Sequence, residues 1–298
     1  MSKPVRIGLF LACLCFLTEL SQGQQPAEKG NRQTPPRLIV RGDDMGFSHS
    51  GNEALIKCFR EGIETSIEVI VPAPWFPEAV RLLEQNPDID VGVHLALSSE
   101  WDNVKWRPLT EGAGLKEDEG YFFPMIYPNA NYPRRSLKEN GPKLEDIEKE
   151  FRAQIELARK RIPRISHVSG HMGCDRLSPE VHAMTRKLAA EYGVDIEPGD
   201  HGVKSVGFAG PRATSEQKLA SFLKMLDGLE PGKTYLFVEH PGLDSPELRA
   251  IHHIGYENVA VDRQGVTDVW TDSRVRQAIR DHQIQLIGYR DLIKSAGK

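Results

Sequence analysis

The sequence predicts an α/β fold, a TIM-like but irregular (β/α) barrel of about seven units, and three observations lead to it. Apolar runs rich in β-branched residues alternate with helical patterns along the chain. The runs are nearly continuous, which is typical of parallel strands buried on both faces of a sheet. Polar clusters follow the C-terminal ends of several runs, where a parallel barrel builds its active site.

The composition fits one large domain or two small ones, with a sizeable core. Of the 298 residues, 39% are hydrophobic, and the formal net charge is −4. A nucleic-acid-binding protein would show a basic patch or stripe, so the charge balance argues against that class. We expect a single domain over residues 37–298. The sequence leaves the oligomeric state open, a homodimer included.

Residues 1–23 have the pattern of a secretory signal peptide. Lys3 and Arg6 give a positive start, residues 7–17 are apolar, and small residues follow at 21–23. The apolar run is short for a membrane span, and the polar residues after it argue against an uncleaved anchor. We therefore expect export to a periplasm or to the outside of the cell, with no membrane span in the mature chain.

The cysteines do not form a disulfide scaffold. Cys13 and Cys15 lie inside the apolar run, which leaves a lipoprotein anchor as an alternative. Cys58 and Cys174 could pair in an exported protein, but Cys58 falls on a predicted helix and is expected to be a small buried apolar residue.

Residues 24–36 are polar and contain Pro and Gly, as in a flexible linker.

After the linker, strands and helices follow one another. A first apolar run is followed by a helix that begins near Gly51 and ends before Gly62, a typical helix-terminating residue. A β-branched run then stops at Pro72, and the next helical pattern ends before Pro87. The expected strands of this half are 38–40, 65–71 and 91–97, and the expected helices are 51–61 and 75–85.

Residues 98–142 break this alternation. A long irregular segment inside a compact domain is usually functional or disordered, and aromatic content argues against disorder. Two interpretations remain open. The segment is an insertion over the mouth of the site, whose aromatic faces could stack on sugar rings, or a small satellite core under a loop. Its aromatic residues are Trp101, Trp106, Tyr121, Phe122, Phe123, Tyr127 and Tyr132.

The second half returns to helices and short strands. Residues 144–161 form a charged helical pattern with one apolar face, and Pro163 ends it. Ser178 and Pro179 are typical of the N-cap and the first position of a further helix. The apolar face of the first helix consists of Ile147, Phe151, Ile155 and Ala158. The expected strands are 165–168, 194–196, 234–238 and 284–287, and the other helices are 215–226, 245–251, 273–281 and a short one from Arg290.

The stretch 41–48 carries two adjacent carboxylates at the end of a strand. Like charges at close range repel, and a cation beside them removes that cost. Gly42 and Gly46 flank Asp43 and Asp44, so the backbone can turn tightly or approach a ligand closely. One interpretation is a metal ligand next to a general base. The other is an acidic turn that caps the next helix, since Asp and Ser are ordinary turn and N-cap residues.

Three more polar clusters lie at or near the ends of predicted strands: His94, His167 with His171, and Glu239 with His240. Alone, His94 would more often be a buried core histidine than a ligand. With Asp44 and His171 it completes an Asp, His, His set, which leaves open positions for water and substrate. The other histidines, on expected loops or helix surfaces, are assigned to solvent: His49, His182, His201, His252, His253 and His282.

In their order, these stretches resemble the YdjC-like carbohydrate deacetylases, also called the chitooligosaccharide deacetylase (ChbG/HpnK) family. The resemblance runs from about residue 38 to the end of the chain, and the middle insertion is its loosest part. It implies a barrel of the polysaccharide-deacetylase type. The matching stretches are the Asp-Asp-x-Gly core within 38–52, Val-Gly-Val-His-Leu at 91–95, the two histidines of 167–171, His-Pro-Gly at 240–242, and 286–292.

The resemblance also implies roles for five residues. Asp44, His94 and His171 would bind one divalent metal ion. Asp43 would be the general base that takes a proton from the attacking water, and His240 would be the general acid that protonates the departing amine.

Two positions depart from the family pattern. The family often has Asp where this chain has Ser169, and many members have His where it has Gly173. The missing Asp weakens the contacts that normally orient a ligating histidine. The departures therefore put the substrate preference in doubt and leave reduced activity open.

These residues predict a metal-dependent hydrolase that removes acetyl groups from N-acetylated amino sugars or short oligosaccharides, an amide hydrolase acting on linear C–N bonds. A bound metal lowers the pKa of water from about 15.7 to about 7, a carboxylate accepts a proton, and a histidine delivers one. Zinc or magnesium would suit the ligands, and manganese or cobalt could replace them. Two alternatives remain: a metal hydrolase of another ester or amide, and a carbohydrate-binding protein that has lost catalysis.

Overall fold

The structure of the protein is a computed structural model that describes residues 1–2 and 34–294. From Thr34 onward the chain forms one compact unit. The predicted signal peptide (1–23) and most of the predicted linker (24–36) lie outside the described residues, and both stay predictions.

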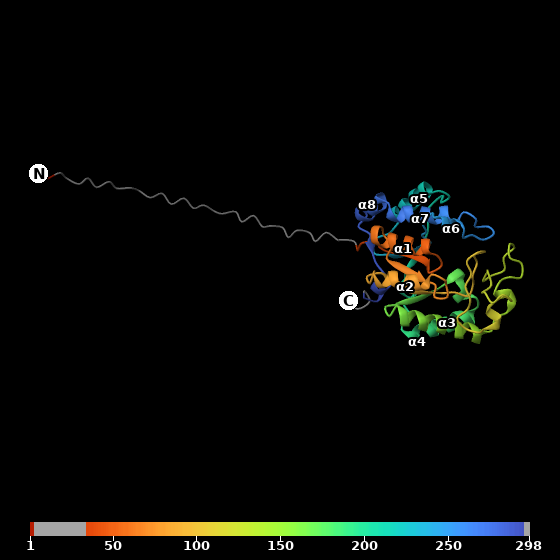
Figure 1. The fold of residues 1–298 in the computed structure, drawn as a ribbon. Coiled ribbons are helices and arrows are strands. Elements are labelled where there is room, and N and C mark those ends of the chain that lie inside the picture. The colour runs from red at the N-terminus through yellow and green to blue at the C-terminus, as the bar shows by residue number, and fades with distance from the viewer. Residues whose placement is uncertain (3–33, 295–298) are drawn as a thin grey trace. The chain divides into compact units, whose positions relative to one another are not determined.

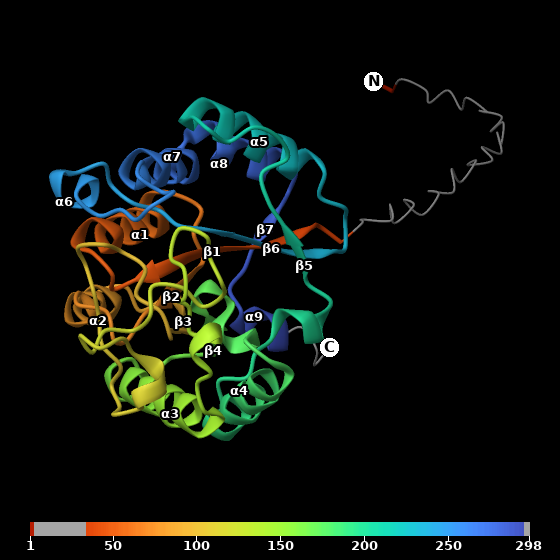
Figure 2. The ribbon, with the colours of Figure 1, turned by 90° about the vertical axis from the view of Figure 1, so that its right-hand side faces the viewer.

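A parallel sheet of seven strands forms the centre of this unit. The strands are β1 Arg37–Met45, β2 Ser66–Val69, β3 Asp90–Leu95, β4 His167–Gly170, β5 Lys204–Val206, β6 Thr234–Glu239 and β7 Gln285–Leu286. Their order is β4-β3-β2-β1-β6-β5, and β7 also pairs with β1. The curled sheet and its parallel strands confirm the predicted α/β fold with an irregular barrel (Figure 2). Within the described residues the barrel stays open, because β4 and β5 each pair with one strand only.

Strand β1 lies in the middle of the sheet. Gly42 pairs with Ile67 of β2 on one side and with Glu239 of β6 on the other. The start of β1 pairs with β7 at Arg37 and Leu38. The C-terminal end of β1 is therefore held on both sides, at the edge of the sheet where the ends of the parallel strands meet.

Helices surround the sheet (Figures 1 and 2). They are α1 His49–Glu61, α2 Phe76–Glu84, α3 Leu144–Arg161, α4 Pro179–Tyr192, α5 Ser215–Asp227, α6 Pro246–Arg249, α7 Val259–Thr271, α8 Ser273–Asp281 and α9 Arg290–Lys294. Short 3₁₀ helices lie at η1 Ala113–Leu115, η2 Lys138–Asn140, η3 His171–Arg176 and η4 Pro198–His201. Helices α5, α7 and α8 group on one side, and α3 and α4 on the other (Figures 1 and 2). In this part of the chain, no helix is long and apolar enough to cross a membrane.

Two sequence-based assignments were wrong in the second half. Residues 194–196 are not a strand, and the next strand is β5, which was not predicted. Val194 is buried, and its N–H bonds the carbonyl of Ala189 beyond Gly193, which has a φ of 65°. It therefore completes the C-terminal cap of α4. Helix α7 was not predicted, because its several β-branched residues and Gly265 do not follow a strong helical pattern.

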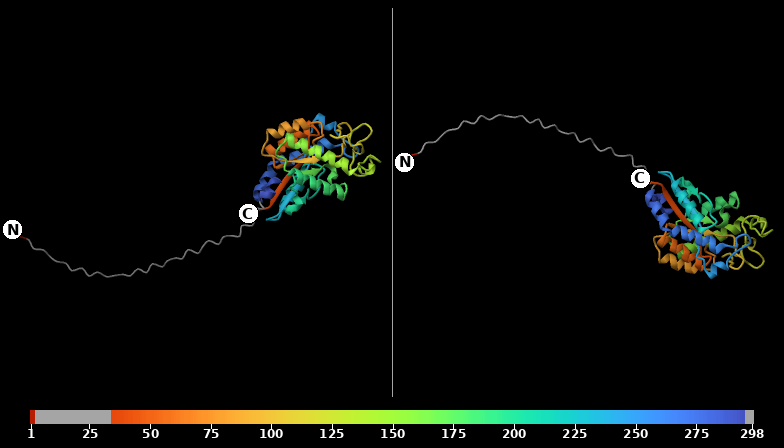
Figure 3. Two further views of the ribbon diagram at one scale, coloured as in Figure 1. Left: turned by 90° about the horizontal axis from the view of Figure 1, so that it is seen from below. Right: turned by 90° about the horizontal axis from the view of Figure 1, so that it is seen from above.

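The insertion 98–142 lies at the end of the fold away from the start of β1 (Figures 1 and 3). Most of its aromatic side chains are buried, but several of them pack into the main core, so they do not form a separate satellite core. Trp106, Phe122, Phe123 and Tyr132 are buried, and Trp106, Phe122 and Phe123 join the main hydrophobic core. Trp101 is also buried, but it lines the site described below.

The two cysteines of the barrel are both free and buried, so they do not form the disulfide that export would permit. Cys58 lies on α1 in the core, as predicted. The Cys174 thiol donates a hydrogen bond to the carbonyl of Leu95.

Candidate active site

Asp43 and Asp44 lie at the C-terminal end of β1 and are 4% and 2% exposed. Asp44 has a backbone φ of 71°, in the left-handed region that few residues other than glycine adopt. Such strained backbone persists where surrounding contacts fix it, and it clusters at functional sites. The acidic pair does not cap the next helix. Ser48 is the N-cap of α1, and its side chain accepts a hydrogen bond from the N–H of Gly51.

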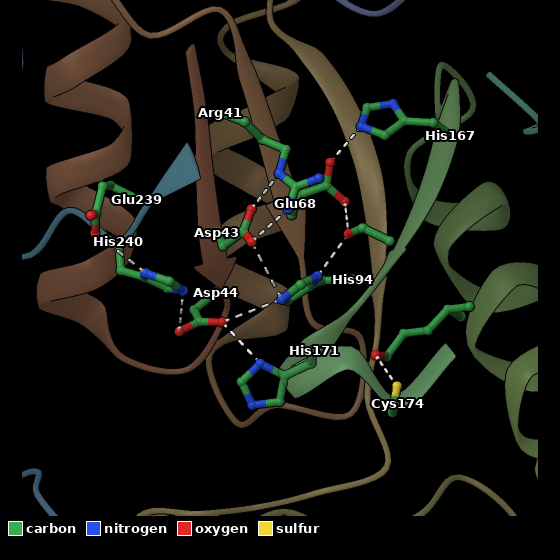
Figure 4. A network of polar contacts seen from close by, with 12 residues as sticks. Arg41, Asp43, Asp44, Glu68, His94, His167, His171, Cys174, Glu239 and His240 are labelled. Carbon is green, nitrogen blue, oxygen red and sulfur yellow. Dashed lines mark hydrogen bonds and ion pairs between the residues drawn. The ribbon is translucent and has the colours of Figure 1, made fainter. Parts of the chain in front are cut away.

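Asp44, His94 and His171 converge on one point (Figure 4). Asp44 Oδ1 lies 3.1 Å from His171 Nδ1 and 3.6 Å from His94 Nε2. In a tetrahedral zinc site with ligands at about 2.0–2.1 Å from the metal, neighbouring ligand atoms are about 3.3 Å apart. Asp44 Oδ1 is buried and has no hydrogen-bond partner in the described part of the chain. This donor set fits a divalent cation, which would take the place of the ion pair between Asp44 Oδ1 and His171 Nδ1.

The outer ring nitrogens of both histidines are held by hydrogen bonds. His94 Nδ1 lies 2.7 Å from Ser169 Oγ, and the Ser169 hydroxyl donates to Glu68. The imidazole therefore donates its Nδ1–H to the serine. On the other side, His171 Nε2 lies 3.0 Å from Glu100 Oε2. These contacts leave the inner nitrogens free to bind a metal. Ser169 thus connects His94 to a carboxylate, which comes from Glu68 one hydrogen bond further away.

The charges around this set differ from residue to residue. Burial opposes ionisation of Asp44, but His240 and His171 hold its pKa well below the usual range. Burial also opposes protonation of His171, but Glu100 and Asp44 raise its pKa to about 10. Burial lowers the pKa of His94. Asp44 and His94 therefore favour the forms that bind metals, whereas His171 must give up a proton to do so.

Asp43 is held by hydrogen bonds from Arg41, which is itself bonded to Tyr289. Arg41 donates from Nε to Asp43 Oδ1 at 2.8 Å and from Nη2 to Oδ2 at 2.9 Å. The third Arg41 contact goes from Nη1 to the hydroxyl of Tyr289 at 2.9 Å. The Tyr289 ring stacks on His167, with centroids 3.5 Å apart. The carboxylate is therefore fixed in orientation, with Oδ2 3.8 Å from His94 Nε2.

His240 lies on the other side of Asp44 from His171 (Figure 4). Its Nε2 is 3.9 Å from Asp44 Oδ2, and its Nδ1 is 3.8 Å from Glu239 Oε2. Burial opposes protonation, but Asp44 and Glu239 raise the pKa of His240. The side chain is 39% exposed, so the protonated ring can meet a ligand from the open side.

All five predicted site residues line one open cavity of about 400 Å³. Arg263 of α7 also lines it and donates from Nη2 to Asp44 Oδ2 at 2.9 Å, which leaves Oδ1 for a metal. His253 was expected to be solvated, but it lies in the cavity wall with Trp101, 5.4 Å between the ring centroids. The cavity is lined by Asp43, Asp44, His94, Glu100, Trp101, Gly170, His171, Met172, His240, His253, Tyr256 and Arg263.

The sequence did not predict several residues that support the site. Arg41 and Tyr289 both lie in stretches that carry the family resemblance, and Arg41 is also only two positions from Asp43, which was the available signal. Glu68 and Glu100 gave a weaker signal, since each is a single acid in or just after an expected strand. Arg263 lies on the helix that was not predicted.

Comparison with known proteins points to one family. The family model described as YdjC-like protein matches residues 37–281. A protein of Listeria innocua named carbohydrate deacetylase 2 is 26% identical over 269 residues, which cover 87% of this chain and 99% of the relative. A carbohydrate deacetylase of Thermus thermophilus is 30% identical over 235 residues, covering 72% of this chain and 80% of the relative.

A solved structure shares the fold. It is a protein of Enterococcus faecalis named for cellobiose-phosphate cleavage, with a TM-score of 0.69 and 21% identity. The match covers 87% of this chain and 99% of that protein. The family match spans the barrel from β1 to α8 and includes every residue of the predicted site. The chain belongs to the YdjC-like family, as its ordered motifs predicted.

Proposed function

We propose that this protein is a metal-dependent carbohydrate deacetylase, which hydrolyses the N-acetyl amide of an amino sugar to an amine and acetate. The observation that carries the proposal is the arrangement of the cavity. The cation-fitting set of Asp44, His94 and His171 lies beside Asp43 and His240 in one cavity. The relatives named carbohydrate deacetylase support the same assignment.

A divalent cation held by Asp44, His94 and His171 would lower the pKa of a water molecule and polarise the acetyl carbonyl. Two imidazoles and one carboxylate suit zinc, and magnesium, manganese and cobalt are the other ions to test. The protein's part is to fix these three side chains, through Ser169 and Glu100 on the two rings.

Asp43 takes the proton of the attacking water. Arg41 bonds both carboxylate oxygens and prevents the carboxylate from rotating, while Asp43 still faces the cavity. A base that is fixed in this way needs little reorganisation when the proton moves. The hydroxyl of the water forms the new bond to the acetyl carbon.

His240 supplies a proton to the departing nitrogen. Asp44 and Glu239 favour its protonated form, which is the form that can donate. As the C–N bond breaks, the bonding pair goes to the nitrogen, which takes the proton from His240 and leaves as the amine. The acetic acid that forms carries the oxygen of the water, and it loses its proton to solvent to give acetate. The site resets when Asp43 loses its proton to solvent and His240 regains one.

The test is acetate release from a panel of N-acetylated amino sugars and oligosaccharides by protein loaded with each of the four metals. Asp43→Asn should lower turnover by about 10²- to 10⁴-fold, the range of general acid–base catalysis. Because Asp43 is not in the cation-fitting set, the variant should keep its metal content. The absence of acetate release by every metal form would overturn the proposal, and release from O-acetyl sugars alone would favour an esterase.

We also propose that the protein is exported, on the sequence pattern of residues 1–23 alone. Cell fractionation and N-terminal sequencing of the recovered protein test this. A chain outside the cytosol that begins after about residue 23 is expected. A cytosolic chain that begins at Met1 would contradict it.

A further inference from the structure

His167 is the histidine of the strand-end clusters to which the proposed reaction gives no role. It is the first residue of β4, its side chain is 0% exposed, and it does not line the catalytic cavity. It therefore does not touch the substrate, and any part that it plays in the reaction acts through other side chains. Its ring contacts two of them, Glu68 and Tyr289.

We propose that His167 is a positioning residue that joins the support of the metal ligand His94 to the support of the base Asp43. One side of its ring holds Glu68, which leads through Ser169 to His94. The other holds Tyr289, which leads through Arg41 to Asp43. The proposal rests on the proposed function, because it assumes that His94 binds a metal and that Asp43 accepts a proton.

The Glu68 arm, which consists of Glu68, Ser169 and His94, leads to the metal ligand (Figure 4). Burial opposes ionisation of Glu68, but His167 and Arg41 lower its pKa to about 2, so its carboxylate can only accept hydrogen bonds. His167 Nε2 donates to Oε1, and the Ser169 hydroxyl donates to Oε2. The Ser169 oxygen accepts the Nδ1–H of His94. His167 thus holds the carboxylate that orients the ring of the metal ligand.

The Tyr289 arm, which consists of Tyr289, Arg41 and Asp43, leads to the base. The rings of His167 and Tyr289 are stacked, with centroids 3.5 Å apart and planes 6° apart. Tyr289 is 1% exposed, and its hydroxyl accepts a hydrogen bond from Arg41 Nη1 at 2.9 Å. The other donors of this guanidinium bond both oxygens of Asp43. The stack therefore fixes the ring whose hydroxyl holds the partner of the base.

The neighbouring strand leaves room for the bond between His167 and Glu68. A Cβ on Gly92 of β3 would lie 2.5 Å from both carboxylate oxygens of Glu68 and 2.5 Å from His167 Nε2. Glycine weakens a strand interior, and it is found there where another group must come close to the backbone. On its far side, His167 Nδ1 lies 2.7 Å from Ser166 Oγ, whose hydroxyl donates to Asp90. The ring is therefore held at both nitrogens, and β3 is shaped around it.

Two variants of His167 separate the arms. His167→Gln can still donate an amide N–H to Glu68, but it has no ring to stack on Tyr289. Its zinc affinity should stay within about twofold of the wild type. Its kcat should fall by about five- to tenfold at an unchanged KM, because Asp43 is oriented less firmly. His167→Phe keeps the stack and loses the bond to Glu68, so its zinc affinity should fall by about three- to tenfold.

Gly92→Ala tests the Glu68 arm a second way, should His167→Phe fail to fold. The added Cβ pushes the two side chains apart while both remain present, so zinc affinity should fall as in His167→Phe. Competition with a chromophoric chelator measures zinc affinity, and acetate release measures kcat and KM. The controls are His282→Gln, on an exposed histidine at the end of α8, and Gly207→Ala, where no atom lies within 4 Å of an added Cβ.

The pattern of zinc affinity across the variants separates positioning from a merely structural role. Affinity kept in His167→Gln and lowered in His167→Phe and Gly92→Ala would support the proposal. Affinity lost equally in all three would overturn it, as would affinity within about twofold of the wild type in both His167→Phe and Gly92→Ala. A wild type that binds zinc but releases no acetate would overturn the deacetylase, and the zinc affinities would then decide the proposal alone. A wild type that binds no zinc would overturn both.

Discussion

Removing the hydroxyl of Ser169 should weaken metal binding, although Ser169 is not in the ligand set. Its oxygen accepts the Nδ1–H of His94 at 2.7 Å, and its hydroxyl donates a hydrogen bond to Glu68. Burial opposes ionisation of Glu68, but His167 and Arg41 lower its pKa to about 2. The two consecutive hydrogen bonds therefore end at a charged acceptor. Ser169→Ala would leave a ring N–H and a carboxylate oxygen without their partner.

The size of the effect follows from the burial of these groups. Losing the outer partner of a metal-binding histidine costs about 10- to 100-fold in metal affinity, which is about 1.4–2.7 kcal/mol. His94 is 3% exposed and Glu68 is 0% exposed, so both groups depend on the hydroxyl as their partner. Ser169 itself is half-buried and lines an open cavity of about 400 Å³, so a water molecule can take part of the place of its hydroxyl. We therefore expect Ser169→Ala to fall toward the lower end of this range.

The assay is competition for zinc between the protein and a chromophoric chelator at neutral pH. Ser169→Thr keeps the hydroxyl on a residue that suits a strand and should stay near the wild type. Ser205→Ala is the matched control, since Ser205 is an exposed serine on β5. The midpoint of thermal unfolding, with and without zinc, gives a second measure, because a ligand stabilises the fold by its binding free energy. An affinity of Ser169→Ala within about twofold of the wild type would refute the reasoning.

Three further results are expected. Arg41→Lys keeps the positive charge but loses the paired hydrogen bonds to Asp43, so kcat should fall by about 10²-fold. Steady-state kinetics would measure this fall, and elemental analysis should show an unchanged metal content. An unchanged kcat would contradict the prediction. Zinc binding should release a proton, because the pKa of His171 is raised to about 10 and only its neutral form binds metal. Affinity should therefore rise by about tenfold per pH unit between pH 6.5 and 9, and calorimetry in buffers of different ionisation enthalpy would detect the proton; a flat profile would count against a proton on this ring. Gly42→Ala should destabilise the fold by about 1–3 kcal/mol in urea unfolding, because a Cβ there would lie 2.0 Å from Glu64 Oε1; wild-type stability would mean that this acid moves away.

The sequence predicted the positions that follow from strand order. Carboxyl ends of parallel strands meet at one edge, so polar residues just after apolar runs were expected to come together. The structure places these residues around one cavity: Asp43, Asp44, His94, His171 and His240. Most strands and helices were also predicted, because their runs are long, apolar and bounded by Gly or Pro.

The supporting residues could not be predicted in the same way. Glu68 lies inside a short apolar strand, and its contact with Ser169 depends on how β2, β3 and β4 lie beside one another. Arg263 reaches Asp44 from a helix that has a weak helical pattern and packs on α1 and α5. From the sequence, Ser169 only lacks the carboxylate that the family often has at this position. The sequence does not show that the Ser169 hydroxyl bonds the carboxylate of Glu68. These contacts are tertiary, and local patterns do not encode them.

The central position of β1 has a consequence for how the protein is made. This strand leaves the ribosome early, but its neighbours β6 and β7 are synthesised near the end of the chain. Two bonds of the site join residues far apart in sequence, Arg41 to Tyr289 across 248 positions and Asp44 to Arg263 across 219. Contacts of such long range form slowly, since the loop between them must close first. In a nascent or C-terminally truncated chain, Asp43 and Asp44 are therefore present before Tyr289 can hold Arg41 and before Arg263 can bond Asp44. The site is assembled only after nearly the whole domain has been synthesised.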